Sequence, residues 1–310
     1  MSATGSKSAI WAALIGNSLV AITKFIAATL TGSSAMFSEG IHSLVDTGNQ
    51  VLLLYGLKRA SKPADENFPF GYGKEVYFWS FIVAILIFAV GAGVSFYEGI
   101  HTIFHPKPIE NPMINYVVLI LAIIFEGASF TIAFKQFVKV KGNWGYFEAI
   151  QQSKDPSLFV VLFEDFAATI GLFVALLGVY LSQSTGILEF DGIASVIIGC
   201  ILAGTAVWLA IETKGLLIGE GANQATNNKI KKIAISNSKI QHVNEVLTMH
   251  MGPDYILLNL SATFVDSAKA DDIEQVIEQL SKKIKAQFPS VKRIFIEAEA
   301  KHSILTKLGK

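Results

Sequence analysis

Six long apolar stretches constrain the fold of this chain more than any other feature of its 310 residues. A helix needs about 20 apolar residues to cross a bilayer, and each stretch is long enough. They cover residues 8–31, 34–58, 75–104, 112–138, 157–182 and 190–213. The chain is 52% hydrophobic and 16% charged, with a mean hydropathy of +0.48, which is too apolar for an ordinary soluble protein. We therefore predict a helical membrane domain with six spans and both termini on one side.

The charges of the chain are distributed unevenly along its length. Lys and Arg equal Asp and Glu at 25 each, so the net charge gives no indication of a nucleic-acid partner, and we expect none. The residues after about 215 are much richer in Lys, Glu and Asp than the spans, which predicts a transmembrane domain over 1–216 and a cytoplasmic domain over 217–310. Cytoplasmic loops carry an excess of bases, and one face collects most of them. These are Lys7, Lys58, Arg59, Lys62, Lys74, Lys139, Lys141, Lys154 and Lys214.

We therefore expect a multi-pass protein, surrounded by membrane lipid, with both termini in the cytoplasm. The bacterial inner membrane is the membrane that we predict for it. The polar C-terminal part reads as a small α+β domain. Two strands over 240–251 and 255–265 are joined by the turn "GPD", and an amphipathic helix over 271–288 stops before Pro289. With a helix over 227–238 and a strand over 291–300, the order is helix, strand, strand, helix, strand.

The stretch "SEGIHSLVDTGNQ" at 38–50 places Glu39, His42 and Asp46 inside the second apolar span. A charge at the centre of a bilayer costs at least about 2.5 kcal/mol, so these residues need a reason to be there. His42 and Asp46 are four residues apart, and they share one face of a helix. An imidazole and a carboxylate at that spacing can bind one metal ion.

The fifth span carries two adjacent acids, Glu164 and Asp165. If the second and fifth spans pack together, then His42, Asp46 and Asp165 surround a divalent cation near the midplane of the bilayer, with Glu164 as a possible fourth ligand. The cation would offset the negative charge of these side chains.

A structural interpretation competes with this metal site. His42 or Asp46 could pair with Lys24 or bond to Asn17 as a clamp between helices. The acids outnumber the bases in the spans, however, and Lys24 cannot neutralise them all. Two roles remain possible for Glu126, an ion relay and helix packing. Asp191 lies close to a span end and is expected to snorkel or to cap a helix.

Several of these features together resemble the cation diffusion facilitator family. They are Asn17 and Lys24 in the first span, "GSSAMFSEGIHSLVD" from the first loop into the second span, "KPADENFPFGYGKE" before the third span, and "YEGI" at 97–100. The resemblance implies six spans followed by a cytoplasmic ferredoxin-like domain. It also implies a homodimer, and an antiporter that moves Zn²⁺ or a similar ion out of the cytoplasm in exchange for protons. Such a protein is not an enzyme.

The chain departs from the pattern of the family at three places. The fifth span usually supplies a second ligand four residues before the Asp165 position, but Val161 occupies it here. Phe68 and Tyr72 replace the histidines of an extra loop site, and only Asp65 remains there. The histidine-rich cluster of the C-terminal domain is also missing. We therefore expect the loop site to be absent, and a metal centre in the C-terminal domain is in doubt.

The sequence leaves the identity of the metal undetermined, and two other functions must be weighed against transport. Zinc ranks first by the resemblance, and Mn²⁺ or Fe²⁺ would suit the oxygen-rich set of ligands. An intramembrane metalloenzyme is disfavoured because the helix motif "HExxH" is absent from the sequence. A non-transporting scaffold or sensor is the remaining alternative.

Overall fold

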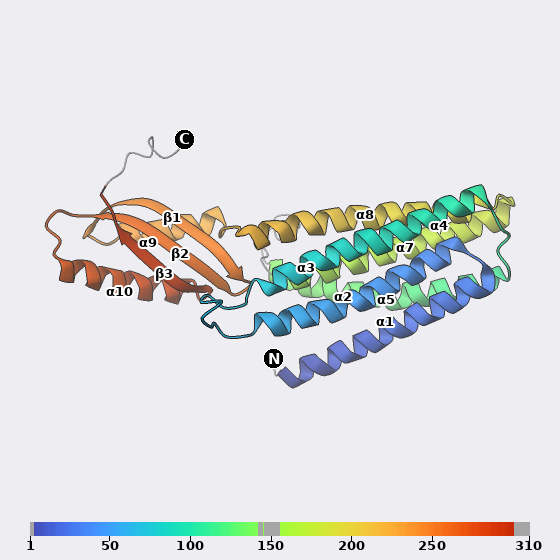
Figure 1. The fold of residues 1–310 in the computed structure, drawn as a ribbon, viewed down its shortest axis with the longest axis horizontal. Coiled ribbons are helices and arrows are strands. Elements are labelled where there is room, and N and C mark those ends of the chain that lie inside the picture. Colours follow the sequence, from blue (N-terminus) through green and yellow to red (C-terminus); the bar gives the residue numbers. More distant parts are fainter. Residues whose placement is uncertain (1–2, 142–144, 146–155, 301–310) are drawn as a thin grey trace. The chain divides into compact units, whose positions relative to one another are not determined.

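The computed structural model describes residues 3–141, 145 and 156–300 (Figure 1). The chain divides into two compact units. One unit consists of Met1–Lys58 and Val76–Lys214, and the other of Arg59–Glu75 and Gly215–Lys310. The loop after the second long helix therefore groups with the C-terminal residues, which the sequence did not predict.

The first unit consists of long helices whose limits agree closely with the predicted apolar stretches. They are α1 (Ala3–Thr31), α2 (Ser34–Ala60), α3 (Glu75–Leu86), α4 (Gly93–Phe104), α5 (Pro112–Lys141), α7 (Pro156–Thr185) and α8 (Glu189–Ile218). Gly32 and Gly186 follow α1 and α7 with φ angles of 69° and 75°. This left-handed backbone conformation is cheap for glycine and ends a helix. Within this unit, α5 packs along α7 and also against α1.

Five helical segments among the described residues are long and apolar enough to cross a membrane. They are Leu14–Thr31, Glu75–Phe104, Pro112–Lys139, Phe159–Thr185 and Glu189–Ile218. The helix α2, which we predicted as a sixth span, has 27 residues and is long enough. Its polar residues make it less apolar than the other five. Glu39, His42, Asp46 and Asn49 are all buried, so these polar groups lie inside the unit.

The segment Glu75–Phe104 contains a π-helical stretch, η1 (Ile87–Ala92), between α3 and α4. Close contacts with α8 follow it. A Cβ atom on Gly99 would lie 2.7 Å from the backbone nitrogen of Val196, and one on Gly192 would lie 2.8 Å from the carbonyl oxygen of Gly99. Only glycine permits this approach of α4 and α8, which is how small residues pack helices in membranes.

Asp191, in the first turn of α8, caps a different helix. Its carboxylate accepts hydrogen bonds from Ser33 Oγ, at 2.6 Å, and from the backbone N–H groups of Ser34 and Ala35. These residues are at the start of α2, where N–H groups have no partner within the helix. The predicted capping role is confirmed, with α2 as the helix that is capped.

The C-terminal unit has the predicted order of elements. It contains α9 (Gln224–Ile235), β1 (Ile240–Gly252), β2 (Tyr255–Phe264), α10 (Ala270–Gln287) and β3 (Val291–Ala298). The sheet order is β1-β2-β3, with β1 and β2 antiparallel and β2 and β3 parallel. In the described residues this is a ferredoxin-like β-α-β-β-α-β arrangement without its first strand, so the strands that would flank that strand pair directly. Its core includes Ile230, Val243, Leu258, Leu260, Val276, Leu280 and Ile284.

Candidate functional site

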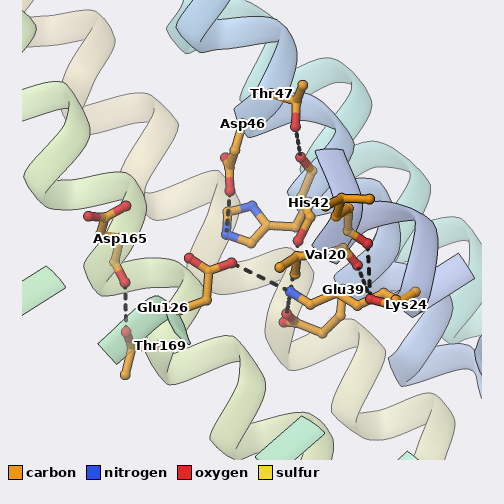
Figure 2. Close-up of polar contacts among 12 residues, drawn as sticks. Val20, Lys24, Glu39, His42, Asp46, Thr47, Glu126, Asp165 and Thr169 are labelled. Atoms are coloured by element: carbon orange, nitrogen blue, oxygen red, sulfur yellow. Dashed lines mark hydrogen bonds and ion pairs between the residues drawn. The ribbon is translucent and has the colours of Figure 1, made fainter. Parts of the chain in front are cut away.

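The buried polar face of α2 is the centre of the candidate site. His42 and Asp46 are 2% and 8% exposed, and His42 Nε2 lies 3.5 Å from Asp46 Oδ2 (Figure 2). The spacing of four residues brings the two side chains together, as the sequence predicted. The same face continues with Asn49, which is fully buried.

Lys24 of α1 takes a partner other than the two that were expected. Its Nζ atom donates to Glu39 Oε2 at 3.1 Å and to Ser43 Oγ at 2.7 Å, and Figure 2 shows the contact with Glu39. Glu126 of α5 lies farther from the same ammonium group, at 4.0 Å. The interpretation of His42 or Asp46 as a clamp with Lys24 is therefore wrong, because Glu39 and Ser43 occupy that lysine.

The two acids of α7 point toward different helices. Glu164 Oε1 accepts a hydrogen bond of 2.8 Å from Asn49 Nδ2 on α2, whereas Asp165 Oδ2 accepts one of 3.0 Å from Ser129 Oγ on α5. Adjacent helical residues are separated by about 100° around the axis, which explains this divergence. Glu164 is thus directed at the α2 side of the cluster and Asp165 at the α5 side.

Negative charge is in excess in the described part of this cluster. It contains five carboxyl groups, those of Glu39, Asp46, Glu126, Glu164 and Asp165, and one ammonium group, that of Lys24. Removing unpaired carboxylates from water costs several kcal/mol each, so this arrangement favours a mobile cation or protons as the missing charge.

Several buried atoms of the cluster lack a hydrogen-bond partner in the described structure. They are both ring nitrogens of His42, Asp46 Oδ1, Asn49 Oδ1 and Glu39 Oε1. At the same time, no three His, Cys, Asp or Glu side chains of the described residues converge closely enough to hold a metal ion together. The helices therefore bring His42 and Asp46 together, and Glu164 to α2, without a complete set of charged ligands around one point.

Sequence reasoning left Asn49 out of the candidate site and gave no role to Glu39. Asn49 could have been found from its spacing, three residues after Asp46 and seven after His42. Glu39 pairs with Lys24 and also lies close to Gly171 of α7, where an added Cβ atom would lie 2.5 Å from Glu39 Oε1. The sequence gives no sign of such a contact between distant helices.

The loop between α2 and α3 uses Asp65 for its own structure. Asp65 Oδ2 accepts a 2.6 Å hydrogen bond from Tyr72 Oη, and Oδ1 accepts from the backbone N–H groups of Asn67 and Phe68. These bonds, first of all the one from Tyr72, hold the pKa of Asp65 below its usual value. They stabilise the ionised form of the carboxylate within the loop.

Comparisons with known proteins point to one family. A family model described as "Cation efflux transmembrane domain" matches residues 10–218. The chain is 32% identical to the protein named "Proton-coupled zinc antiporter SLC30A9, mitochondrial" of Xenopus laevis, over 80% of this chain and 45% of that one. It is 30% identical to "Metal tolerance protein C4" of Arabidopsis thaliana, over 80% of this chain and 55% of that one. The chain thus spans about half the length of these two relatives.

Two further proteins are similar to this chain, one over nearly its whole length and one over about a quarter of it. The "Manganese efflux system protein MneP" of Bacillus subtilis is 23% identical over 92% of each chain. Among solved structures, a variant of the MamM C-terminal domain in a nickel form matches over all of its own length and 26% of this chain, at 15% identity and a TM-score of 0.24.

Proposed function

We propose that this chain, which belongs to the cation efflux (cation diffusion facilitator) family, exports a divalent metal cation from the cytoplasm by alternating access. The observation that carries the proposal is the excess of buried carboxyl groups on α2, α5 and α7 over the single ammonium group of Lys24 in the described cluster. A transported dication offsets this charge while it is bound. Its departure leaves a site that must take up protons or another ion. The family is one of transporters and not of enzymes.

The ligands proposed for the cation are His42, Asp46, Glu164 and Asp165. His42 and Asp46 already lie side by side, and Glu164 is held against α2. Asp165 would join after α7 turns away from Ser129, and such rotation is a means of changing affinity between the two states of an alternating-access cycle. Zn²⁺ is the first candidate for the cargo, and Mn²⁺ or Fe²⁺ are the next, because one imidazole with carboxylates suits all three ions. The names of the relatives include both a zinc antiporter and a manganese efflux protein.

Proton exchange is proposed as the driving reaction, with His42 as the group that couples it to the metal. An unperturbed imidazole titrates near pH 6.5, so protons and metal can compete for it in the pH range of cells. Metal needs the neutral ring, so a more acidic outer side favours release and the cytoplasmic side favours binding. The sequence contains no "GxxxxGKS" motif, which agrees with transport driven by a gradient.

The remaining parts of the proposal concern assembly and location. We propose a homodimer, domain limits of 1–216 and 217–310, and both termini in the cytoplasm. The animal relatives are named as mitochondrial, so the bacterial inner membrane rests on the sequence interpretation alone. Light scattering of the purified protein in detergent measures its molar mass and so tests the dimer.

The test of the function is metal flux into liposomes that contain a metal-sensitive dye. The expected result is saturable uptake of Zn²⁺ or Mn²⁺ that increases with an imposed pH gradient. The matched control is Asp46→Asn, which keeps the shape of the side chain and loses its charge. Absence of flux in the wild-type protein would favour a scaffold, and flux that ignores the gradient would rule out proton antiport.

A further inference from the structure

Asn49 is a buried polar residue of α2 on the face that carries His42 and Asp46. It follows them by seven and three residues, so the three side chains lie within two turns along one face. Its side chain is completely buried. Burying an amide without partners for its polar atoms is costly. The contacts of its two polar atoms therefore indicate what it does.

One end of the Asn49 side chain has a clear partner. Its Nδ2 atom donates to Glu164 Oε1 at 2.8 Å, which joins α2 to α7. When Glu164 is ionised its oxygens only accept hydrogen bonds, which matches the amide nitrogen that faces it in the structure. This fixes the other end of the amide, the carbonyl oxygen Oδ1, on the side away from that bond.

The carbonyl oxygen of Asn49 has no hydrogen-bond partner among the described residues, although it is fully buried. A buried acceptor without a partner loses the hydrogen bonds that water would give it, so its free energy is unfavourable. The other atoms of α2 in this condition include both ring nitrogens of His42 and Asp46 Oδ1. One helix face thus presents an imidazole, a carboxylate oxygen and an amide oxygen, all of which can bind a metal and none of which has a hydrogen-bond partner in the described part of the chain.

We infer that Asn49 is a ligand of the transported cation through Oδ1 and positions Glu164 through Nδ2. The inference rests on the function proposed above. It supplies an oxygen ligand from α2 where Val161 of α7 cannot supply one. It also agrees with the absence, among the described residues, of three converging His, Cys, Asp or Glu side chains, because the amide is a ligand of another type. Amide oxygens are hard ligands that suit Mn²⁺ better than softer ions.

A purely structural role makes a different prediction. If Asn49 only clamps α2 to α7, its N–H donor matters and its oxygen does not. Asn49→Asp removes the donor and keeps an oxygen at the same place, whereas Asn49→Leu removes both. The two variants therefore separate a ligand from a clamp. Asn115 of α5 is a matched control, because it is also fully buried and bonds to Thr31 Oγ1 through its Oδ1 atom, outside the cluster.

The experiment measures Mn²⁺ and Zn²⁺ binding by titration calorimetry on the full-length protein in detergent. We expect Asn49→Leu to weaken Mn²⁺ binding about tenfold or more, in the range seen when a supporting residue of a metal site is lost, and Zn²⁺ binding by less. Asn49→Asp should lose less Mn²⁺ affinity than Asn49→Leu, because it keeps the oxygen and loses only the donor to Glu164, and Asn115→Leu should leave the ratio of the two affinities unchanged.

Two results would overturn the inference while leaving the proposed function in place. One is a wild-type protein that binds metal while Asn49→Leu binds both ions as tightly. The other is an equal loss of Mn²⁺ affinity in Asn49→Leu and Asn49→Asp, which would identify a clamp. If Asn49→Leu does not fold, Asn49→Ala takes its place in the comparison with Asn49→Asp, since it also removes both the donor and the oxygen. A wild type that binds neither ion would overturn the proposed function together with the inference.

Discussion

The ammonium group of Lys24 lies 3.1 Å from the carboxylate of Glu39, and neither side chain has exposed surface. This pair joins α1 to α2, and it neutralises the single positive charge in the described cluster. Asp46, Glu126, Glu164 and Asp165 are therefore left without a cation as close as the one that Glu39 has. The ion pair thus separates a structural acid from the acids that are available to a transported ion.

Replacing Lys24 alone should be more harmful than replacing the pair. Lys24→Met leaves Glu39 as an unpaired buried charge, which costs about 3–5 kcal/mol of stability. The double variant Lys24→Met/Glu39→Gln removes both charges and should recover most of that loss. Thermal unfolding in detergent measures both. A double variant as unstable as the single one would show that lost packing, and not the buried charge, causes the effect.

Gly171→Ala should disturb the same ion pair from the side of α7. An added Cβ atom would lie 2.5 Å from Glu39 Oε1, so the carboxylate must move away from α7. Gly204→Ala in α8 is the matched control, because a Cβ atom there meets nothing within 4 Å. Alanine is favoured over glycine in a helix by about 0.5–1 kcal/mol, so the control should be neutral or more stable and Gly171→Ala less stable. Equal melting temperatures for the two variants would contradict the close contact.

The two acids of α7 should affect different steps of transport. Glu164→Gln keeps an acceptor for Asn49 but removes a carboxylate that is proposed as a ligand, so metal affinity should fall at least about tenfold. Asp165→Asn keeps an acceptor for Ser129, and we expect it to lower the turnover of metal more than its affinity. Calorimetry and liposome flux measure the two quantities. Loss of both in Glu164→Gln with a fully active Asp165→Asn would exclude Asp165 as a ligand.

His42→Asp should move the pH dependence of metal binding downward. In water an imidazole takes up a proton near pH 6.5 and a carboxylate near pH 3.9, so by this intrinsic difference a carboxylate keeps its metal to lower pH. The pH midpoint of metal binding should therefore fall, and acceptance of Mn²⁺ should increase. Binding titrations over a pH series measure the midpoint. An unchanged midpoint would remove His42 as the group that couples metal to protons.

The limits of the helices could be predicted closely because residues near each helix end determine them. Apolar runs of sufficient length begin and end at turn residues such as Gly32 and Pro112, and the predicted segment 75–104 is found as Glu75–Phe104. The π-helical stretch Ile87–Ala92 could not be predicted in this way, because no residue there breaks the apolar pattern. The grouping of Arg59–Glu75 with the C-terminal unit also depends on contacts between distant segments.

The candidate site could be predicted only in part for a related reason. The contact between His42 and Asp46 is local to one helix, and its spacing is visible in the sequence. The partners of Lys24 and Glu164 lie on other helices, and which face meets which depends on the rotation of each helix about its axis. A rotation of α7 by about 100° about its axis would turn Asp165 to the direction in which Glu164 now points. The apolar pattern of the sequence does not show which of the two orientations the helix takes.

Asp191 fixes the start of α2 to the first turn of α8. Its carboxylate accepts hydrogen bonds from Ser33, Ser34 and Ala35, so Asp191→Ala should speed amide hydrogen exchange at Ser34 and Ala35. Sliding α2 along its axis would break these bonds, whereas tilting α2 about its first turn leaves them in place. A tilt of α2 about this held end would displace Asn49 more than Asp46, and Asp46 more than His42, because displacement grows with distance from the fixed point.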